Sequence, residues 1–581
     1  MTDFKVSLGT SRRRMMLLAL LGLVLGGVGG GAAYLVVHLV GLISNLTLLH
    51  RVGFDLPDLR HYHPSPVLIP EAVGGAAVVV ALARWSPIIK GHGIPESLEA
   101  ILFRESRVAP RAALAKPVSA AVAMGTGGPF GAEGPIIVTG ASIGSLLGQV
   151  LPVSPAERKI LLATGAAAGM AGVFATPVAA VVLAFELLLF ERSLRAVVPL
   201  VAATSVATAL HHVLIGAHPL FPLARSFAPP IEQLPLFVVL GLAAGVLAVV
   251  LNRGLFATEA VFRRLPVPDW SHPLIGAVGF AAIGLAVPGS LSVGYWAITD
   301  AVNGRFTLAV AAVLFIGKMV SWWVGLGSNT SGGTLAPMFL VGASMGEMVG
   351  IGFAHAFPGA HIHPGAFALV GMGVTFGVGA RALLTGVVFA AEVTGGYGLI
   401  VPLLLATVFA EVVAEAGLRE RVMTDKLARR GYRVDFDAQV DPLRTRVAGQ
   451  VMSLGVPGAG EAGSDPRPGR DTATPSPTPA ALVDRPASVD RWDYVVEALP
   501  ALTAGCDEVE VTDAGRVVGR LDRAAVDSLL SGRASDERVQ SPSLVLWRRR
   551  RPVTSEPKRE RDAPADPAVD RADVGGQLEG R

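Results

Sequence analysis

The chain has 581 residues, of which 51% are hydrophobic and only 16% are charged. A soluble protein carries about a quarter charged residues, so the composition indicates an integral membrane protein. The net charge of +3 is too small to indicate a nucleic-acid partner, and the single cysteine, Cys506, excludes an internal disulfide.

The first predicted element follows a short basic stretch. Arg12, Arg13 and Arg14 precede an apolar run from Met15 to about Ile43 that has no Asp, Glu, Lys or Arg. A signal peptide is the alternative interpretation, but its apolar core is about half as long. We therefore predict a cytoplasmic segment over 1–14 and a first transmembrane helix whose basic end faces the cytoplasm.

Apolar segments with short connectors then follow one another to about residue 420. Some, such as Ala112–Met124, are too short to cross about 30 Å of hydrocarbon as straight helices. Others, such as Lys159–Phe190 and Ala366–Leu418, are too long to be one helix. The pattern predicts an all-α polytopic membrane domain over 15–435, with tilted helices and with broken helices buried in protein.

The composition changes after about residue 440, where charged residues become frequent. A loop rich in Gly, Pro, Ser and Thr covers 455–480 within a predicted small α/β cytoplasmic domain over 440–545. We expect strands at Glu508–Thr512 and Arg516–Leu521, with helices near Trp492–Ala501 and up to Leu530. The charged, Pro-rich tail over 549–581 is predicted to be disordered.

The membrane domain contains an internal repeat. Eight residues of Gly125–Gly148 recur in Gly327–Gly350 at a constant offset of 202. Gly165–Glu186 matches Gly371–Glu392 at an offset of 206, and 91–93 matches 292–294 weakly at 201. Chance similarity between glycine-rich helices is the alternative, but three collinear matches at nearly one offset argue against it. We predict two repeats, over about 66–216 and 273–418.

Three of the repeated loops are glycine-rich and end in a proline that opens an apolar helix. Proline fits the first turn of a helix, and glycine lets backbone N–H groups turn towards a ligand. A helix N-terminus offers unpaired donors and a partial positive charge. Because transporter repeats meet at the substrate site through broken helices, we predict an anion site at these loops, which are Gly91–Pro95, Gly131–Pro135 and Gly333–Pro337.

These loops resemble the signature loops of the CLC family of chloride channels and chloride/proton antiporters. The family's GSGIP, GREGP and GxFxP read GHGIP, GAEGP and GTLAP here, in the same order. The resemblance covers about 15–435. It implies the CLC fold with two inverted-topology repeats, and a homodimer in the cell membrane with one pore per subunit and both termini in the cytoplasm.

The resemblance also implies site residues. Glu133 matches the gating glutamate, whose carboxylate occupies the outer anion site and leaves when it is protonated or displaced; an acid that merely begins a helix is the alternative. Lys116 matches a family lysine near the pore, where its field raises anion occupancy, and a lysine reaching out from a helix end is the alternative. The implied anion-binding residues are His92, Gly93, Ile94, Ala132, Glu133, Gly134, Thr334, Leu335, Ala336 and Met423.

Several positions depart from the family pattern. His92 replaces the central serine and Met423 the central tyrosine, so both hydroxyls of the family's central site are absent. His92 either donates a hydrogen bond to the anion or points elsewhere. Leu335 replaces a phenylalanine and Ala132 replaces the arginine of GREGP, so the pore is expected to be reshaped.

The proton route of the family's antiporters is a further departure. The internal proton glutamate falls on Leu187, next to Glu186, which matches a structural glutamate and recurs as Glu392. This loss favours a channel-like or weakly coupled chloride transporter gated by Glu133, with a chloride/proton antiporter as the alternative. Water or Glu191 remains open as a source of protons.

The C-terminal region resembles a degenerate CBS module, over 447–452 and 511–519. The aspartate that meets ribose in such modules falls near Ala525, so we expect a structural domain without nucleotide binding. Here and in the membrane domain we predict no metal and no cofactor.

Two functions of other classes compete with anion transport. A cation- or proton-coupled solute transporter would use Glu133 and Glu186 as ligands, but hard cations need several convergent oxygens. An intramembrane enzyme would use Ser142 or Ser344, whose matched positions suit close helix packing instead. A metal at His361 and His363 would lack acidic partners, so we predict that the protein is not an enzyme.

Overall fold

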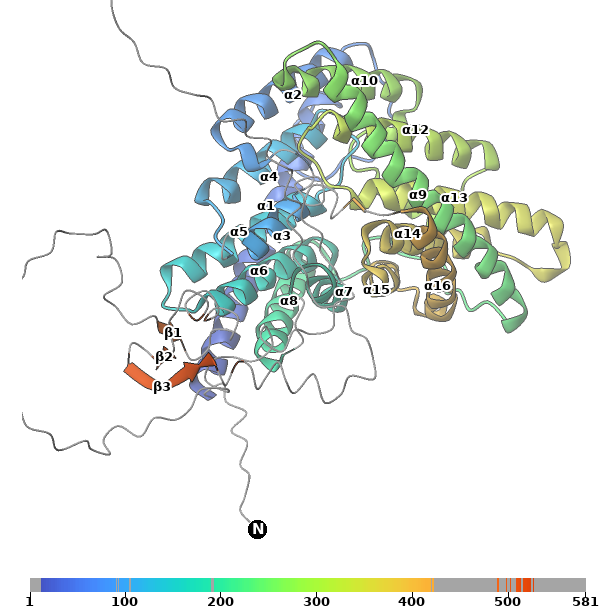
Figure 1. The fold of residues 1–581 in the computed structure, drawn as a ribbon. Coiled ribbons are helices and arrows are strands. Elements are labelled where there is room, and N and C mark those ends of the chain that lie inside the picture. The colour runs from blue at the N-terminus through green and yellow to red at the C-terminus, as the bar shows by residue number, and fades with distance from the viewer. Residues whose placement is uncertain are drawn as a thin grey trace, which may run out of the picture.

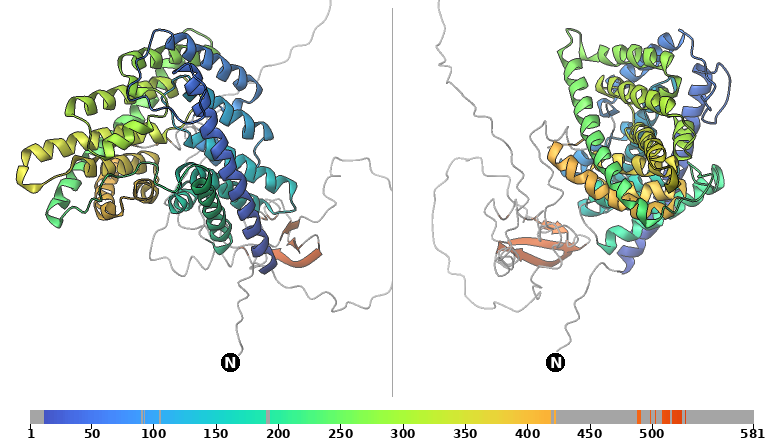
Figure 2. Two further views of the ribbon diagram at one scale, coloured as in Figure 1. Left: turned by 180° about the vertical axis from the view of Figure 1, so that it is seen from behind. Right: turned by 90° about the vertical axis from the view of Figure 1, so that its right-hand side faces the viewer.

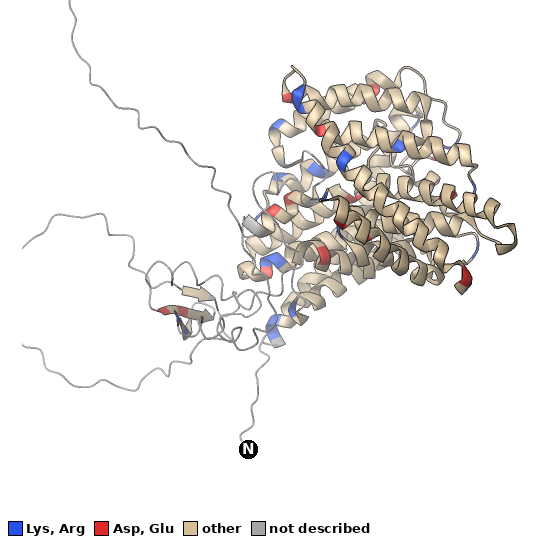
Figure 3. Cartoon of the chain, turned by 45° about the vertical axis from the view of Figure 1, so that its right-hand side comes forward, with Lys and Arg blue, Asp and Glu red and all other residues tan. Residues whose placement is uncertain are grey.

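The computed structural model describes residues 12–418 apart from Lys90, His92, 104–105 and 190–192, then 421–422 and short stretches between 488 and 526. The described chain is mostly helical, and seven of its helices are long and apolar enough to cross a membrane (Figure 1). Figure 3 shows few positions of Lys, Arg, Asp or Glu over the helical body, as contact with lipid requires. The predicted all-α polytopic membrane fold is therefore confirmed.

The membrane domain consists of two successive series of helices that lie beside each other (Figure 1, blue to teal and green to orange). The first series is α1 (Arg12–Thr47), α2 (Leu68–Trp85), α3 (Ile94–Phe103), α4 (Pro110–Gly125), α5 (Glu133–Val150), α6 (Pro155–Phe174), α7 (Pro177–Leu183) and α8 (Leu194–Leu214). The second is α9 (Leu234–Arg264), α10 (His272–Ala286), α11 (Tyr295–Val302), α12 (Leu308–Gly327), α13 (Leu335–Ala356), α14 (Pro364–Ala380), α15 (Leu383–Thr394) and α16 (Ile400–Gly417).

The long apolar segments break where the backbone becomes left-handed. Lys159–Phe190 divides between α6 and α7 at Ala175, whose φ is 53°, and Pro177 then opens α7. A π-helical turn, Ala184–Leu189, continues α7. The segment Ala366–Leu418 divides at Arg381 and Gly395, whose φ values are 59° and 72°. A left-handed residue ends a helix because the next N–H no longer points along the helix axis.

Glycines allow the first helix of each series to approach the last one closely. A Cβ at Gly26 of α1 would lie 2.5 Å from the main-chain oxygen of Ala203 in α8. A Cβ at Gly245 of α9 would lie 2.5 Å from the main-chain oxygen of Ala410 in α16. The long α1 (dark blue in Figure 2) runs along its half of the molecule in this way. The matched contacts extend the repeat to α1–α8 and α9–α16, beyond the predicted 66–216 and 273–418.

A small sheet follows the membrane domain along the chain. It has the order β1 (Ser488–Asp490), β2 (Glu508–Asp513) and β3 (Arg516–Asp522). β2 and β3 are antiparallel and correspond to the two predicted strands, whereas β1 pairs with β2 in parallel. Apart from a few single residues, the predicted helices of this unit lie outside the described residues, as do the 455–480 insert and the 549–581 tail.

Candidate functional site

The three glycine-rich loops predicted from the repeat meet in the structure. The N–H of Gly333 donates to the oxygen of Gly131 at 3.0 Å, and the N–H of Gly131 donates back at 3.3 Å. Gly91 donates to the oxygen of Thr330 at 3.2 Å and accepts a hydrogen bond from Gly332 at 3.4 Å. The loop before α13 therefore ties together the loops before α3 and α5, and it brings the three helix N-termini to one place.

Each of these helices begins one or two residues before its proline. Pro135 is the third residue of α5, Pro337 the third residue of α13, and Pro95 the second residue of α3. Because proline has no N–H, its place in the first turn wastes no hydrogen bond. The other N–H groups of the first turn have no acceptor within their helix, so they can donate to an anion.

Glu133 is the first residue of α5, and its side chain is buried at the junction of the loops, with a relative exposure of 1%. A Cβ at Gly131 would overlap the carboxylate, and a Cβ at Gly333 would lie 2.7 Å from Oε2. The amides of Glu133 itself and of Ala336 point near the carboxylate, but neither reaches hydrogen-bond geometry. Both carboxylate oxygens thus lack a hydrogen-bond partner among the described residues, so the partial positive charge of the helix N-termini is what favours the carboxylate here.

The other predicted anion-binding residues fall into three groups. Five are buried at the starts of α5 and α13, namely Ala132, Gly134, Thr334, Leu335 and Ala336. Gly93 is also buried and has a φ of 94°, and the backbone of Ile94 begins α3. His92 and Met423 lie outside the described residues.

Lys116 supports the loop before α3. Its side chain has 0% exposure, which contradicts the alternative of a lysine that reaches the surface from a helix end. The Nζ atom donates to the main-chain oxygens of Ile89 at 2.7 Å and Gly91 at 2.6 Å. The ammonium group therefore stabilises the loop that positions the N-terminus of α3.

Lys318 on α12 is a site residue that our sequence reasoning missed. It lies 202 positions after Lys116, the offset of the repeat, and its side chain also has 0% exposure. Its Nζ donates to the main-chain oxygens of Ser290 at 3.1 Å and Ser292 at 2.7 Å, in the loop before α11. Comparing the polar positions of the two repeats would have found this lysine.

The start of α11 is the counterpart, in the second repeat, of the start of α3. Gly294, with a φ of 77°, precedes Tyr295, the first residue of α11, and corresponds to Gly93 before α3. The Tyr295 hydroxyl is buried without a hydrogen-bond partner in the described part of the chain.

Glu186 and Glu392 cap helices of the opposite repeat. Glu186 accepts hydrogen bonds from the N–H groups of Leu384 and Thr385, both at 2.9 Å, and from Thr385 Oγ1 at 2.6 Å, at the start of α15. Glu392 accepts from the N–H groups of the second and third residues of α7 at 3.1 Å and 2.8 Å. This reciprocal capping gives Glu186 and Glu392 a shared structural role. Leu187 is buried beside Glu186, and Glu191 lies outside the described residues.

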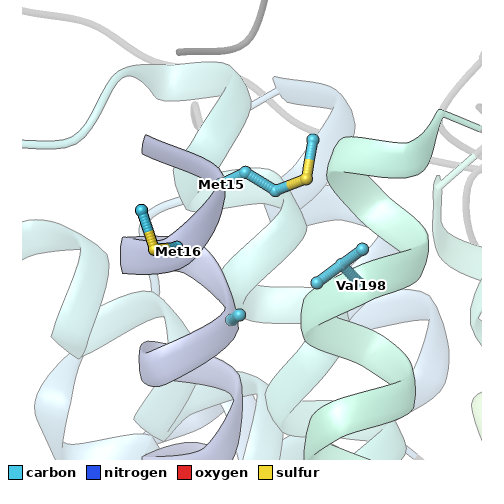
Figure 4. A pocket seen from close by; sticks show the side chains of 4 residues that line it. Met15, Met16 and Val198 are labelled. Carbon is cyan, nitrogen blue, oxygen red and sulfur yellow. The ribbon is translucent and has the colours of Figure 1, made fainter. Parts of the chain in front are cut away.

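The pocket in Figure 4 lies away from these loops, between α1 and α8. Its lining consists of Met15, Met16, Ala19 and Val198, so it offers no side-chain hydrogen-bond donor to an anion.

Two helical repeats that meet at buried helix N-termini define a membrane protein built like the secondary transporters. The family described as voltage gated chloride channel matches residues 74–415. The H(+)/Cl(-) exchange transporter ClcA of Yersinia pestis bv. Antiqua (strain Angola) is 30% identical over 349 residues, which cover 58% of this chain and 71% of the relative. ClcA of Vibrio campbellii (strain ATCC BAA-1116) is 29% identical over 418 residues, which cover 70% and 87%. The chain belongs to the voltage-gated chloride channel family.

Solved structures confirm the CLC fold. The crystal structure of a slow cyanobacterial Cl-/H+ antiporter matches with a TM-score of 0.63 and 27% identity, over 73% of this chain and 99% of that chain. A eukaryotic CLC transporter matches with a TM-score of 0.60 over 88% of this chain and 98% of that chain. Because its sequence is only 20% identical, this second structure supports the fold alone.

Proposed function

We propose that this protein carries chloride across the membrane in exchange for protons, through a pore in each subunit that Glu133 gates. The observation that carries the proposal is the buried Glu133 carboxylate, which lies between the starts of α5 and α13 without a hydrogen bond. The same helix N-termini attract a carboxylate and a chloride ion, so each can displace the other. The relatives named as H(+)/Cl(-) exchange transporters support both chloride and protons as the transported ions.

Two buried lysines support an anion over a cation as the transported ion. Lys116 and Lys318 both lie within the helical body next to loops of the site. A hard cation would need several convergent oxygens. The described residues contain no group of three or more His, Cys, Asp or Glu side chains that could hold a metal ion.

The exchange mechanism takes precedence over the channel-like mechanism that Leu187 favours. The curated relatives are named exchange transporters, and the solved structure with 27% identity is an antiporter. A channel or uncoupled transporter stays the second candidate, because Leu187 replaces the internal acid and Glu186 is engaged in capping. If the protein exchanges chloride for protons, the proton must reach Glu133 without the help of a carboxylate at position 187, where the chain has leucine.

Reconstituted liposomes with a chloride gradient separate these mechanisms. We expect the wild-type protein to drive protons uphill as chloride moves, because both ions use the position of the Glu133 carboxylate. Glu133→Gln should continue to move chloride, lose its dependence on pH, and stop moving protons. Glu71→Gln is a matched control, since Glu71 also lies in the first turn of its helix, α2.

The outcomes have distinct meanings. Chloride flux with no proton movement in the wild type would establish the channel-like mechanism. Sodium flux in place of chloride flux, or a Glu133→Gln protein without any flux, would contradict the proposal itself.

We further propose that the protein is a homodimer in the cell membrane with both termini in the cytoplasm. The basic residues at the start of α1 support this orientation. A surface for a second copy is the exposed apolar stripe of α16, formed by Val401, Leu404, Val408 and Val412. Cross-linking in native membranes should yield dimers, and protease should cut the C-terminal region only from the cytoplasmic side. The absence of nucleotide binding in that region stays a prediction.

A further inference from the structure

Two tryptophans hold arginine side chains at the end of α2. The guanidinium carbon of Arg84 lies 5.9 Å from the ring centre of Trp270, which is in the short turn Asp269–Ser271 before α10. The guanidinium carbon of Arg111, the second residue of α4, lies 5.9 Å from the ring centre of Trp85. Arg84 and Trp85 are the last two residues of α2, so both pairs meet at one helix end.

This helix end lies where the headgroups of the membrane are expected. The segment Leu68–Trp85 is long and apolar enough to cross a membrane, so Arg84 and Trp85 stand at the end of its span. Trp85 and Trp270 are 44% and 50% exposed, and exposed tryptophan in membrane proteins concentrates at the headgroup level. Because α1 and α2 are each long enough to cross once, α2 ends on the side where α1 begins, which is the cytoplasmic side in the proposed orientation.

The two guanidinium groups keep their N–H donors available. In the described part of the chain, neither Arg84 nor Arg111 has a hydrogen bond or a carboxylate within 4 Å. Packing over a ring engages the face of a guanidinium group, whereas its five N–H donors lie in its plane and suit phosphate oxygens. Arg60 differs, because it packs over Trp296 but donates to the carboxylates of Asp58 and Asp300.

Exposed apolar side chains continue from this end along both helices. Val78 lies two turns before Trp85 on the same side of α2 and is 46% exposed. Leu114 lies about one turn after Arg111 on α4 and is 62% exposed. Positive charge at a helix end, followed by an exposed apolar surface, matches the order of parts in an anionic phospholipid.

We propose that the end of α2 binds an anionic phospholipid, with Arg84 and Arg111 on its headgroup and with its acyl chains along α2 and α4. Trp85 and Trp270 orient the two guanidinium groups. Two uncompensated positive charges favour a headgroup with a net negative charge over a zwitterionic one, whose ammonium group they repel. A free phosphate would meet the same donors but would leave the exposed apolar surface uncovered. The site is separate from Glu133 and does not depend on the proposed transport function.

Lipid retention by the purified full-length protein tests this site. The protein in detergent is mixed with equal amounts of phosphatidylglycerol and phosphatidylcholine, and native mass spectrometry counts the bound copies of each. The wild type should retain phosphatidylglycerol in preference. Arg84→Gln and Arg111→Gln should each lower this preference about fivefold, the factor that one arginine contributes near an anionic surface. The preference is a ratio within one sample, so a lower yield of folded protein does not alter it.

Three further variants separate a built site from general surface charge. Arg13→Gln is the matched control, because Arg13 is exposed at the start of α1 and has no ring partner among the described residues. It should change the preference less than about twofold. Trp85→Leu should lower the preference although it removes no charge, because Arg111 loses the ring that orients it. Asp269→Asn should raise the preference, because it removes an exposed negative charge next to Trp270.

The contrary outcomes are equally definite. If the double variant Arg84→Gln, Arg111→Gln keeps the wild-type preference, or if Arg13→Gln lowers it as much, the site is overturned. If excess inorganic phosphate removes the bound phosphatidylglycerol, the donors hold a free phosphate and the assignment to a lipid fails. Because no transport is measured, a failure of the proposed exchange of chloride for protons would leave these results unchanged.

Discussion

Replacing Gly131 with alanine should displace the Glu133 side chain without changing Glu133 itself. Gly131 does not have a positive φ, so alanine fits its main chain. The new Cβ would overlap Cδ, Oε1 and Oε2 of Glu133. These atoms form the end of a flexible side chain, so the carboxylate moves and the backbone stays.

The size of the effect follows from this overlap. The nearest contact must lengthen by roughly 1.5 Å to reach an ordinary van der Waals distance of about 3.5 Å. Overpacking of this kind costs about 1–3 kcal/mol if the carboxylate stays. A cost of about 3 kcal/mol lowers the share of the buried arrangement more than a hundredfold. The free energy of unfolding should change by no more than about 1 kcal/mol, because a new rotamer relieves the contact.

The assay is chloride efflux and proton uptake in liposomes, at pH 7.5 and pH 5 with the membrane potential clamped. Gly131→Ala should behave like Glu133→Gln, with faster chloride flux at pH 7.5 and little proton movement. Gly74→Ala is the control, since nothing lies within 4 Å of its Cβ. A Gly131→Ala protein that keeps wild-type pH dependence and proton coupling would refute the placement of the carboxylate against Gly131.

Two predictions concern stability, measured by thermal unfolding in detergent. Glu186→Ala removes three hydrogen bonds from the start of α15, so the free energy of unfolding should fall by about 3 kcal/mol. Chloride flux per folded molecule should stay within about twofold of the wild type. An unchanged unfolding temperature would contradict the capping role. Arg14→Gln removes two hydrogen bonds of 2.7 Å to the buried Glu157. Arg14 is 20% exposed and Arg195 remains 3.9 Å from Glu157, so the expected loss is about 1–2 kcal/mol, and adding Glu157→Gln should recover part of it.

Backbone geometry explains why the sequence predicts the loops of the site. A helix start that exposes N–H groups needs glycine before it and tolerates proline in its first turn. Both residue types are present at these loops in each repeat. The same offset relates Lys116 to Lys318. Lys318 stands alone within the apolar helix α12, however, and its role comes from a hydrogen bond to a distant loop, which the sequence does not indicate. Hydrogen bonds of this kind, between a helix and a loop that lies more than 20 residues away, form only in the folded repeat.

Two other features were beyond sequence reasoning for different reasons. The matching of Glu186 with Glu392 indicates a shared role, yet each binds the helix of the opposite repeat, which depends on how the halves pack. The breaks at Ala175 and Arg381 use left-handed residues that are not glycine, so no glycine signals them. Their strain of about 1–2 kcal/mol each is offset by the packing of the helices on either side.

The capping by Glu186 bears directly on the proposed exchange. Both of its carboxylate oxygens accept hydrogen bonds from the start of α15, so a proton bound there would break the cap and loosen the contact between the repeats. Leu187 beside it has no ionisable group. Glu186 is therefore poorly suited to carry protons, and within the proposed exchange the protons reach Glu133 by a route that uses neither Glu186 nor an acid at position 187, such as water or hydroxyl groups, with Glu191 still open as their source. The Tyr295 hydroxyl at the start of α11 is buried and has no hydrogen-bond partner among the described residues, so it is a hydroxyl group that such a route could include.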